Sequence, residues 1–181
     1  FAINHAIGGL DVWGYHAVNL SLHIACALLI FAILRRLSTP ALAFGTSMLW
    51  VVHPLNSEAV MYLTQRTELM MAACLLLTVY AALRDWRAVA VLACAAGMLC
   101  KETMVVAPLV VVMLDWAYGA ETFTATWRRR WPLYAALAAT WIILAAMLIT
   151  RGQTTTAGFS TSGVTAWGYL LPATLVLLWL A

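Results

Sequence analysis

Charged side chains are scarce in this sequence. Only 9% of its 181 residues are Asp, Glu, Lys or Arg, whereas 65% are hydrophobic. Soluble domains carry about a quarter charged residues, so this composition excludes a soluble globular domain and an intrinsically disordered chain. The ten basic and seven acidic residues give a net charge of +3, too small and too scattered for a nucleic-acid-binding surface. The chain is therefore predicted to be a polytopic membrane protein with no nucleic-acid partner.

Cysteines are few as well, and they lack the paired spacing of disulfide or metal sites. All four lie in apolar runs and are predicted to be buried small hydrophobic residues: Cys26, Cys74, Cys94 and Cys100. The nucleotide-binding patterns G-x-x-x-x-G-K-S/T and G-x-G-x-x-G are absent, as is the zinc-protease pattern H-E-x-x-H. Residues 158–163 miss the G-x-S-x-G motif by one position and fall in a polar loop, which argues against a serine hydrolase.

Long apolar runs dominate what is present. Seven can be delimited, at about residues 16–34, 38–53, 69–83, 88–100, 103–118, 133–150 and 166–181. Backbone groups in lipid must hydrogen-bond within the protein, and these runs lack the alternation of barrel strands, so each is predicted to be a helix. We therefore expect an all-α fold, a transmembrane bundle of about seven helices. Several runs fall short of the roughly 20 residues that span a bilayer. The second and fourth are the weakest, so either could instead be a re-entrant hairpin.

Basic residues distinguish between these alternatives. If every run crosses the membrane, seven of the ten fall on one side: Arg35, Arg36, Arg84, Arg87, Arg128, Arg129 and Arg130. Only Arg66, Lys101 and Arg151 fall on the other side, and a re-entrant run would divide the seven. Because positive charge concentrates on the cytoplasmic side, the pattern favours seven crossings and a cytoplasmic seven-arginine side. Residues 127–131 are predicted to be an interfacial anchor there, with recognition of lipid head groups as the alternative.

The first helix carries a polar face toward the opposite, non-cytoplasmic side. His16, Asn19 and His23 are spaced i, i+3 and i+7, which places them on one helix face. Two histidines seven residues apart lie about 10 Å apart along the axis, too far to share a metal ion, so no metal site is predicted here. The face either forms hydrogen bonds between helices or lines a substrate cavity.

A second polar stretch covers residues 53–68. Pro54 is predicted to end the second run after His53, because the residue before a proline avoids the helical region. Asn56 or Ser57 is expected to cap the next helix. One face of that helix is predicted to carry Glu58, Tyr62, Gln65 and Arg66, and so presents a carboxylate and a guanidinium. Because the arginine fork matches phosphate oxygens, this face predicts binding of a phosphorylated, hydroxyl-rich substrate; an interfacial ion pair beside an ordinary cap is the alternative.

The third polar feature is the pair Lys101 and Glu102, a hinge between two apolar runs. Lys101 is the only lysine in the chain, and it lies on the side where positive charge is disfavoured. Such a lysine could contact a phosphate, or it could snorkel to the interface beside a neighbouring counter-ion.

Residues 4–23, 53–66 and 101–116 together resemble the membrane domain of the transmembrane and tetratricopeptide-repeat family of O-mannosyltransferase-like proteins. That family is similar to the GT-C glycosyltransferases, which use polyprenyl-phosphate sugars. The resemblance covers about residues 1–120. It extends to residue positions that belong to the family's pattern, namely His16, Asn19, His23, His53, Glu58, Arg66, Lys101 and Glu102.

The resemblance implies a partial GT-C-like fold and an outward-facing site that passes a sugar from a polyprenyl phosphate to a protein or glycan acceptor. It also implies an acidic general base on a loop before Phe1 and repeats after Ala181. Residues 1–181 are thus expected to be a fragment of one transmembrane domain, inactive alone. No cofactor is certain, and a divalent cation is possible. A bacterial inner membrane is favoured over the endoplasmic reticulum.

Inverting sugar transfer needs a base for the acceptor hydroxyl and cations for the leaving phosphate. We therefore predict that Arg66 and Lys101 contact the donor phosphate, while Glu58 and Glu102 orient them or meet acceptor hydroxyls. His53, His16 and Asn19 are further cavity candidates. Two other functions stay open: a transporter or flippase of lipid-linked sugars, and a non-catalytic membrane anchor for a repeat scaffold.

Overall fold

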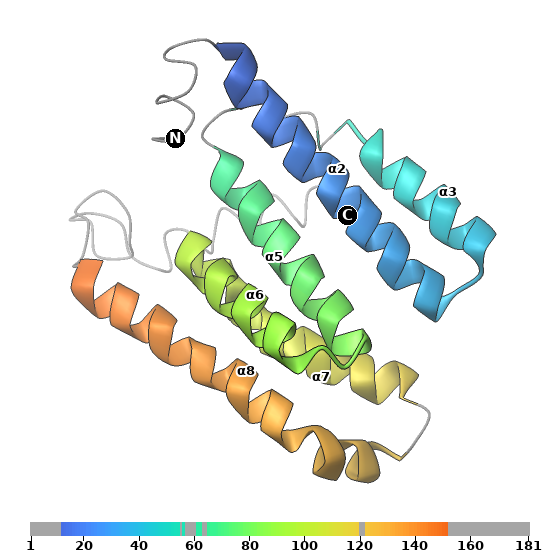
Figure 1. The fold of residues 1–181 in the computed structure, drawn as a ribbon, viewed down its shortest axis with the longest axis vertical. Coiled ribbons are helices and arrows are strands. Elements are labelled where there is room, and N and C mark those ends of the chain that lie inside the picture. The colour runs from blue at the N-terminus through green and yellow to red at the C-terminus, as the bar shows by residue number, and fades with distance from the viewer. Residues whose placement is uncertain (1–11, 55, 57–60, 63–64, 120–121, 152–181) are drawn as a thin grey trace, which may run out of the picture. The chain divides into compact units, whose positions relative to one another are not determined.

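The structure is a computed structural model, and it describes residues 12–54, 56, 61–62, 65–119 and 122–151. The described residues form helices and turns and contain no strand, as the composition predicts (Figure 1). The elements in chain order are α2 (Val12–Leu37), α3 (Pro40–Val51), α5 (Arg66–Leu83), α6 (Arg87–Cys100), the 3₁₀ helix η2 (Glu102–Val106), α7 (Ala107–Tyr118) and α8 (Phe123–Arg151).

Successive helices of this set run in opposite directions (Figure 1). The alternation gathers the seven arginines predicted to share a side at one end of the bundle, called here the arginine-rich end; the other is the arginine-poor end. Within the described residues, three helices can cross a membrane by length and composition: Trp13–Leu37, Arg66–Leu83 and Thr124–Met147. The apolar helices Pro40–Val51 and Arg87–Cys100 are shorter, as predicted for the second and fourth runs. The seventh predicted run, residues 166–181, lies outside the described residues.

One predicted helix starts earlier than expected, and one predicted run is divided into two elements. The sixth helix was expected from residue 133, but α8 begins at Phe123 and includes three arginines and Pro132. Arginine is a good helix former, so charge at the membrane edge does not end a helix. The run predicted at residues 103–118 is divided instead, because η2 precedes α7 and Pro108 lies in the first turn of α7, where its missing N–H costs no hydrogen bond.

Two turns set the helix directions at the arginine-rich end. Thr39 caps α3 by accepting a hydrogen bond from Leu42 N at 3.4 Å, with Pro40 at the first helical position. Between α5 and α6, Asp85 has a φ of 56°, the left-handed region that Asp tolerates better than most residues. The next residue, Trp86, donates its N–H to Ala81 O at 2.8 Å, which closes the turn.

Small residues fill the contact between α5 and α6. Ala81, Ala82, Ala90 and Cys94 are almost fully buried, and such residues let helix backbones approach closely. Gly97 continues this face: a Cβ there would lie 2.7 Å from Met104 Sδ. The outer surface is as apolar as the core, since Leu28, Leu92 and Ile142 among others are more than 60% exposed. An apolar exterior of this extent fits a lipid environment and not water.

Candidate functional site

Arg66 connects α2 to α5 at the arginine-poor end. It is the first residue of α5 and is only 5% exposed. Its Nε donates to Oδ1 of the fully buried Asn19 at 3.0 Å, and a terminal nitrogen donates to Tyr15 O at 3.0 Å. The guanidinium also lies 5.6 Å from the Tyr15 ring centroid, within cation–π range. The structure thus brings together two predicted site residues, Arg66 and Asn19, in a contact that holds two helices.

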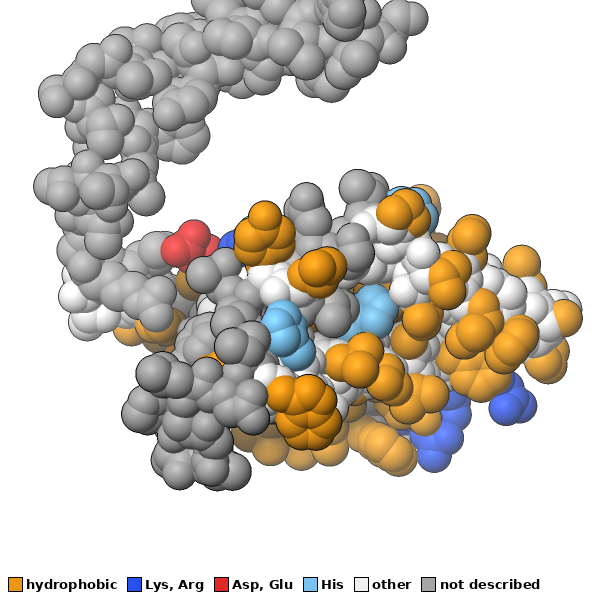
Figure 2. Space-filling view, turned by 90° about the horizontal axis from the view of Figure 1, so that it is seen from above, with side chains coloured by type: hydrophobic (Ala, Val, Ile, Leu, Met, Phe, Trp, Pro, Cys, Tyr) orange, Lys and Arg blue, Asp and Glu red, His pale blue; other side chains and the backbone are white. Residues whose placement is uncertain are grey.

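His23 faces another neighbour from the same side of α2. Its Nε2 lies 3.2 Å from Val51 O, at the last turn of α3, and its ring stacks on Trp50 at 4.8 Å. Asn19 and His23 both make hydrogen bonds between helices, which is the first of the two roles predicted for this face. His16 is half-buried and His53 is exposed beyond the end of α3. Figure 2 looks onto this end, where histidine side chains lie among hydrophobic ones.

Asn56 has a role that the sequence did not predict. Its side-chain Nδ2 donates to Trp50 O, one of the last carbonyls of α3, which have no partner within that helix. The helix that Asn56 is predicted to cap includes residues outside the described ones. Glu58 also lies outside them.

Lys101 forms an ion pair with Glu68 and not with its sequence neighbour Glu102. Lys101 follows the last residue of α6, and Glu68 lies in the first turn of α5. Their side chains are 36% and 38% exposed, so the pair is open to a ligand at the arginine-poor end. Glu102 is exposed at the start of η2. Sequence reasoning gave Glu68 no role, although it is the one acid in the first turn of α5 and belongs to the same end as Lys101.

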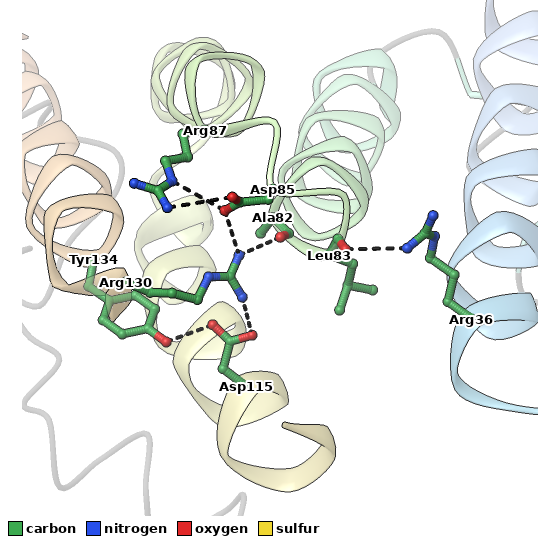
Figure 3. A network of polar contacts seen from close by, with 8 residues as sticks. All are labelled: Arg36, Ala82, Leu83, Asp85, Arg87, Asp115, Arg130 and Tyr134. Atoms are coloured by element: carbon green, nitrogen blue, oxygen red, sulfur yellow. Dashed lines mark hydrogen bonds and ion pairs between the residues drawn. The ribbon is translucent and has the colours of Figure 1, made fainter. Parts of the chain in front are cut away.

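The arginine-rich end holds a buried polar network, seen in Figure 3. Arg130 forms an ion pair with Asp115 and donates to Ala82 O, and Tyr134 Oη donates to the other Asp115 oxygen at 2.6 Å. Arg130 and Asp115 are each 8% exposed. Arg130 departs from the interfacial anchor predicted for residues 127–131, because its guanidinium turns inward to join α5, α7 and α8.

Metal ligands are not assembled in the part of the chain that the structure describes. No three His, Cys, Asp or Glu side chains there lie close enough together to hold one ion. Cys26 and Cys94 are buried, as predicted, and Cys74 and Cys100 are half-buried; all four are free thiols.

The helical fold, the apolar exterior and the two polar ends together define a polytopic α-helical membrane protein. Its relatives include two proteins from Drosophila melanogaster, Protein O-mannosyl-transferase Tmtc2, 36% identical over 131 residues, and Protein O-mannosyl-transferase Tmtc1, 32% identical over 123. Each match covers 64% of this chain and 14% of the relative. The human Protein O-mannosyl-transferase TMTC2 is 36% identical over 69 residues, 38% of this chain and 8% of that protein. These names confirm the resemblance to O-mannosyltransferase-like proteins that residues 4–23, 53–66 and 101–116 predict.

The chain spans about one seventh of the length of these two Drosophila relatives. No family model matches the sequence, and no solved structure matches the chain. The relatives named above are animal proteins, so they give no support to the predicted bacterial inner membrane, whereas the membrane itself is supported by the apolar helices.

Proposed function

We propose that this chain is part of an integral-membrane glycosyltransferase that passes a sugar from a polyprenyl-phosphate donor to a protein acceptor. The half-exposed ion pair of Lys101 and Glu68 at the arginine-poor end carries the proposal, because it presents a cation where a lipid-linked phosphate can reach it. The names of the relatives, all protein O-mannosyl-transferases, support the reaction class and the protein acceptor. The arginine-poor end faces the non-cytoplasmic side in this proposal, as the positive-inside rule predicts.

Lys101 and Arg66 have different roles in this proposal because the first is partly exposed and the second is buried. As the donor's sugar leaves, negative charge grows on the phosphate, and a fixed cation nearby lowers the energy of that transition state. Lys101 is the accessible cation, and Glu68 holds its ammonium group in place until a phosphate competes for it. Arg66 is buried and bonded to Asn19 and Tyr15, so it acts as a positioning residue that fixes α2 against α5. No described residue is assigned the role of the acidic base that deprotonates the acceptor.

Replacement of Lys101 by Gln tests the proposal in the intact protein. We expect transfer from a polyprenyl-phosphate mannose to a protein acceptor to fall roughly 100-fold, the size of effect seen when one transition-state contact is lost. Lys101→Arg should keep most activity because it keeps the charge. Arg84→Gln is the matched control, since it removes one exposed positive charge from the arginine-rich end.

Unchanged transfer by Lys101→Gln, or an equal loss in Arg84→Gln, would contradict the assignment. A protein that moves lipid-linked sugar across vesicles without transferring it would favour the transporter alternative. Intact protein that does neither would favour the anchoring alternative.

A further inference from the structure

A polar cavity of about 340 Å³ opens at the arginine-rich end, among the turn between α5 and α6 and the first part of α8. It is lined by Ala82, Leu83, Asp85, Arg87, Arg129 and Arg130. We propose that this cavity binds the phosphate head group of an anionic membrane lipid. The inference does not rest on the proposed function, because it concerns the opposite end of the bundle.

Charge favours a phosphate in this cavity. Three arginines line it against one aspartate, so the lining carries an excess of positive charge. Arginine presents its N–H groups in a planar fork that matches phosphate oxygens. The cavity therefore has the donors and the sign of charge that an anionic head group requires.

The cavity wall is fixed before any ligand arrives. Arg130 is held by Asp115 and by Ala82 O, and its terminal nitrogen lies 3.8 Å from Asp85 (Figure 3). Arg87 donates to both Asp85 oxygens, at 3.2 and 3.5 Å. Asp85 itself is positioned by its left-handed turn. Two guanidinium groups thus have set positions, which reduces the ordering cost of binding.

Tryptophans place the cavity at the depth of lipid head groups. Trp86 is 46% exposed and flanks the α5–α6 turn, and Trp127 and Trp131 are exposed on the same part of α8. Tryptophan concentrates at the boundary between lipid tails and water. A phosphate at this depth belongs more readily to a lipid than to a soluble metabolite.

An apolar groove adjoins the cavity. It measures about 450 Å³, and Arg87 lines both sites; its other walls are Ala88, Val91 and Leu92 of α6 and Pro132, Leu133 and Ala136 of α8. A lipid has the same division, with a charged head and an apolar chain. The groove lets one acyl chain lie between α6 and α8 while the phosphate meets the arginines.

Native mass spectrometry of the intact, delipidated protein tests this inference. We expect phosphatidic acid to remain bound where phosphatidylcholine does not. Arg129→Gln and Arg87→Gln should each weaken the apparent Kd for phosphatidic acid about tenfold, the value of one lost charge-assisted hydrogen bond. Arg128→Gln is the matched control: it removes the same charge from the adjacent, exposed position, and Arg128 lines neither the cavity nor the groove.

A second variant separates the head group from the chain. Leu92→Trp should fill the groove and weaken phosphatidic acid binding, while the binding of glycerol 3-phosphate, which has no acyl chains, stays unchanged. Equal retention of phosphatidic acid and phosphatidylcholine would overturn the inference. So would an equal loss in Arg128→Gln, which would indicate general attraction to a basic surface, or glycerol 3-phosphate binding as tight as that of phosphatidic acid.

Discussion

Arg66 holds two helices together at the arginine-poor end. Its two hydrogen bonds end on α2, on the side chain of Asn19 and on the backbone of Tyr15, and water has almost no access to it. A buried hydrogen bond to a charged group stabilises a protein by about 1.5–3 kcal/mol. Loss of Arg66 should therefore weaken the fold as well as the reaction.

We predict that Arg66→Gln lowers the melting temperature of the intact protein in detergent by several degrees and lowers transfer with it. Asn19→Ala should do the same by removing the acceptor of the Arg66 Nε–H. The melting temperature of the double variant should be close to that of the worse single variant, because both changes break the same hydrogen bond between Arg66 and Asn19. A full loss of transfer with an unchanged melting temperature would instead identify Arg66 as a direct phosphate ligand, as the sequence alone predicts.

At the scale of helices, Asp115 is part of a contact that connects three of them. It lies at the end of α7, accepts hydrogen bonds from two residues of α8, and through Arg130 reaches the last turn of α5. Removal of one member of a buried ion pair leaves the other charged and unpaired, at a cost of about 3–5 kcal/mol.

Asp115→Leu should accordingly lower the melting temperature of the intact protein far more than Tyr134→Phe, which removes a single hydrogen bond. Replacing both partners, with Asp115→Leu and Arg130→Met together, should recover much of the loss because no buried charge remains. Asp85→Asn is the control, since its side chain is 62% exposed. Equal melting temperatures for Asp115→Leu and Asp85→Asn would show that the network contributes little.

The helices themselves were largely predictable, and their contacts were not. Apolar runs delimit a membrane helix because backbone groups in lipid must hydrogen-bond within the protein. Each of the six predicted runs that fall within the described residues contains a helix. Arg66 and Asn19 are 47 residues apart and Asp115 and Arg130 are 15 apart, and each pair depends on how two helices rotate about their axes. Neither composition nor spacing records that rotation, so the sequence placed Arg130 in an interfacial anchor and left Glu68 without a role.

At the scale of the whole molecule, the two ends of the described bundle carry different polar residues. Seven arginines and the buried network lie at one end, whereas Asn19, Arg66, Lys101 and Glu68 lie at the other. The proposed transfer requires the arginine-poor end to face away from the cytoplasm. The proposed lipid cavity then meets the cytoplasmic leaflet, where anionic lipids are abundant.

Thiol labelling can test this orientation directly. In a cysteine-free background, Val52→Cys reports on the arginine-poor end and Thr122→Cys on the arginine-rich end, and both positions are exposed. A membrane-impermeant maleimide applied to sealed right-side-out vesicles should label position 52 at once and position 122 only after detergent opens the vesicles. Because the charge bias fixes orientation through the short loops, neutralising Arg128, Arg129 and Arg130 together should reduce this asymmetry. The reverse labelling pattern would place Lys101 beside the cytoplasm, and the donor phosphate would then have to be presented from that side.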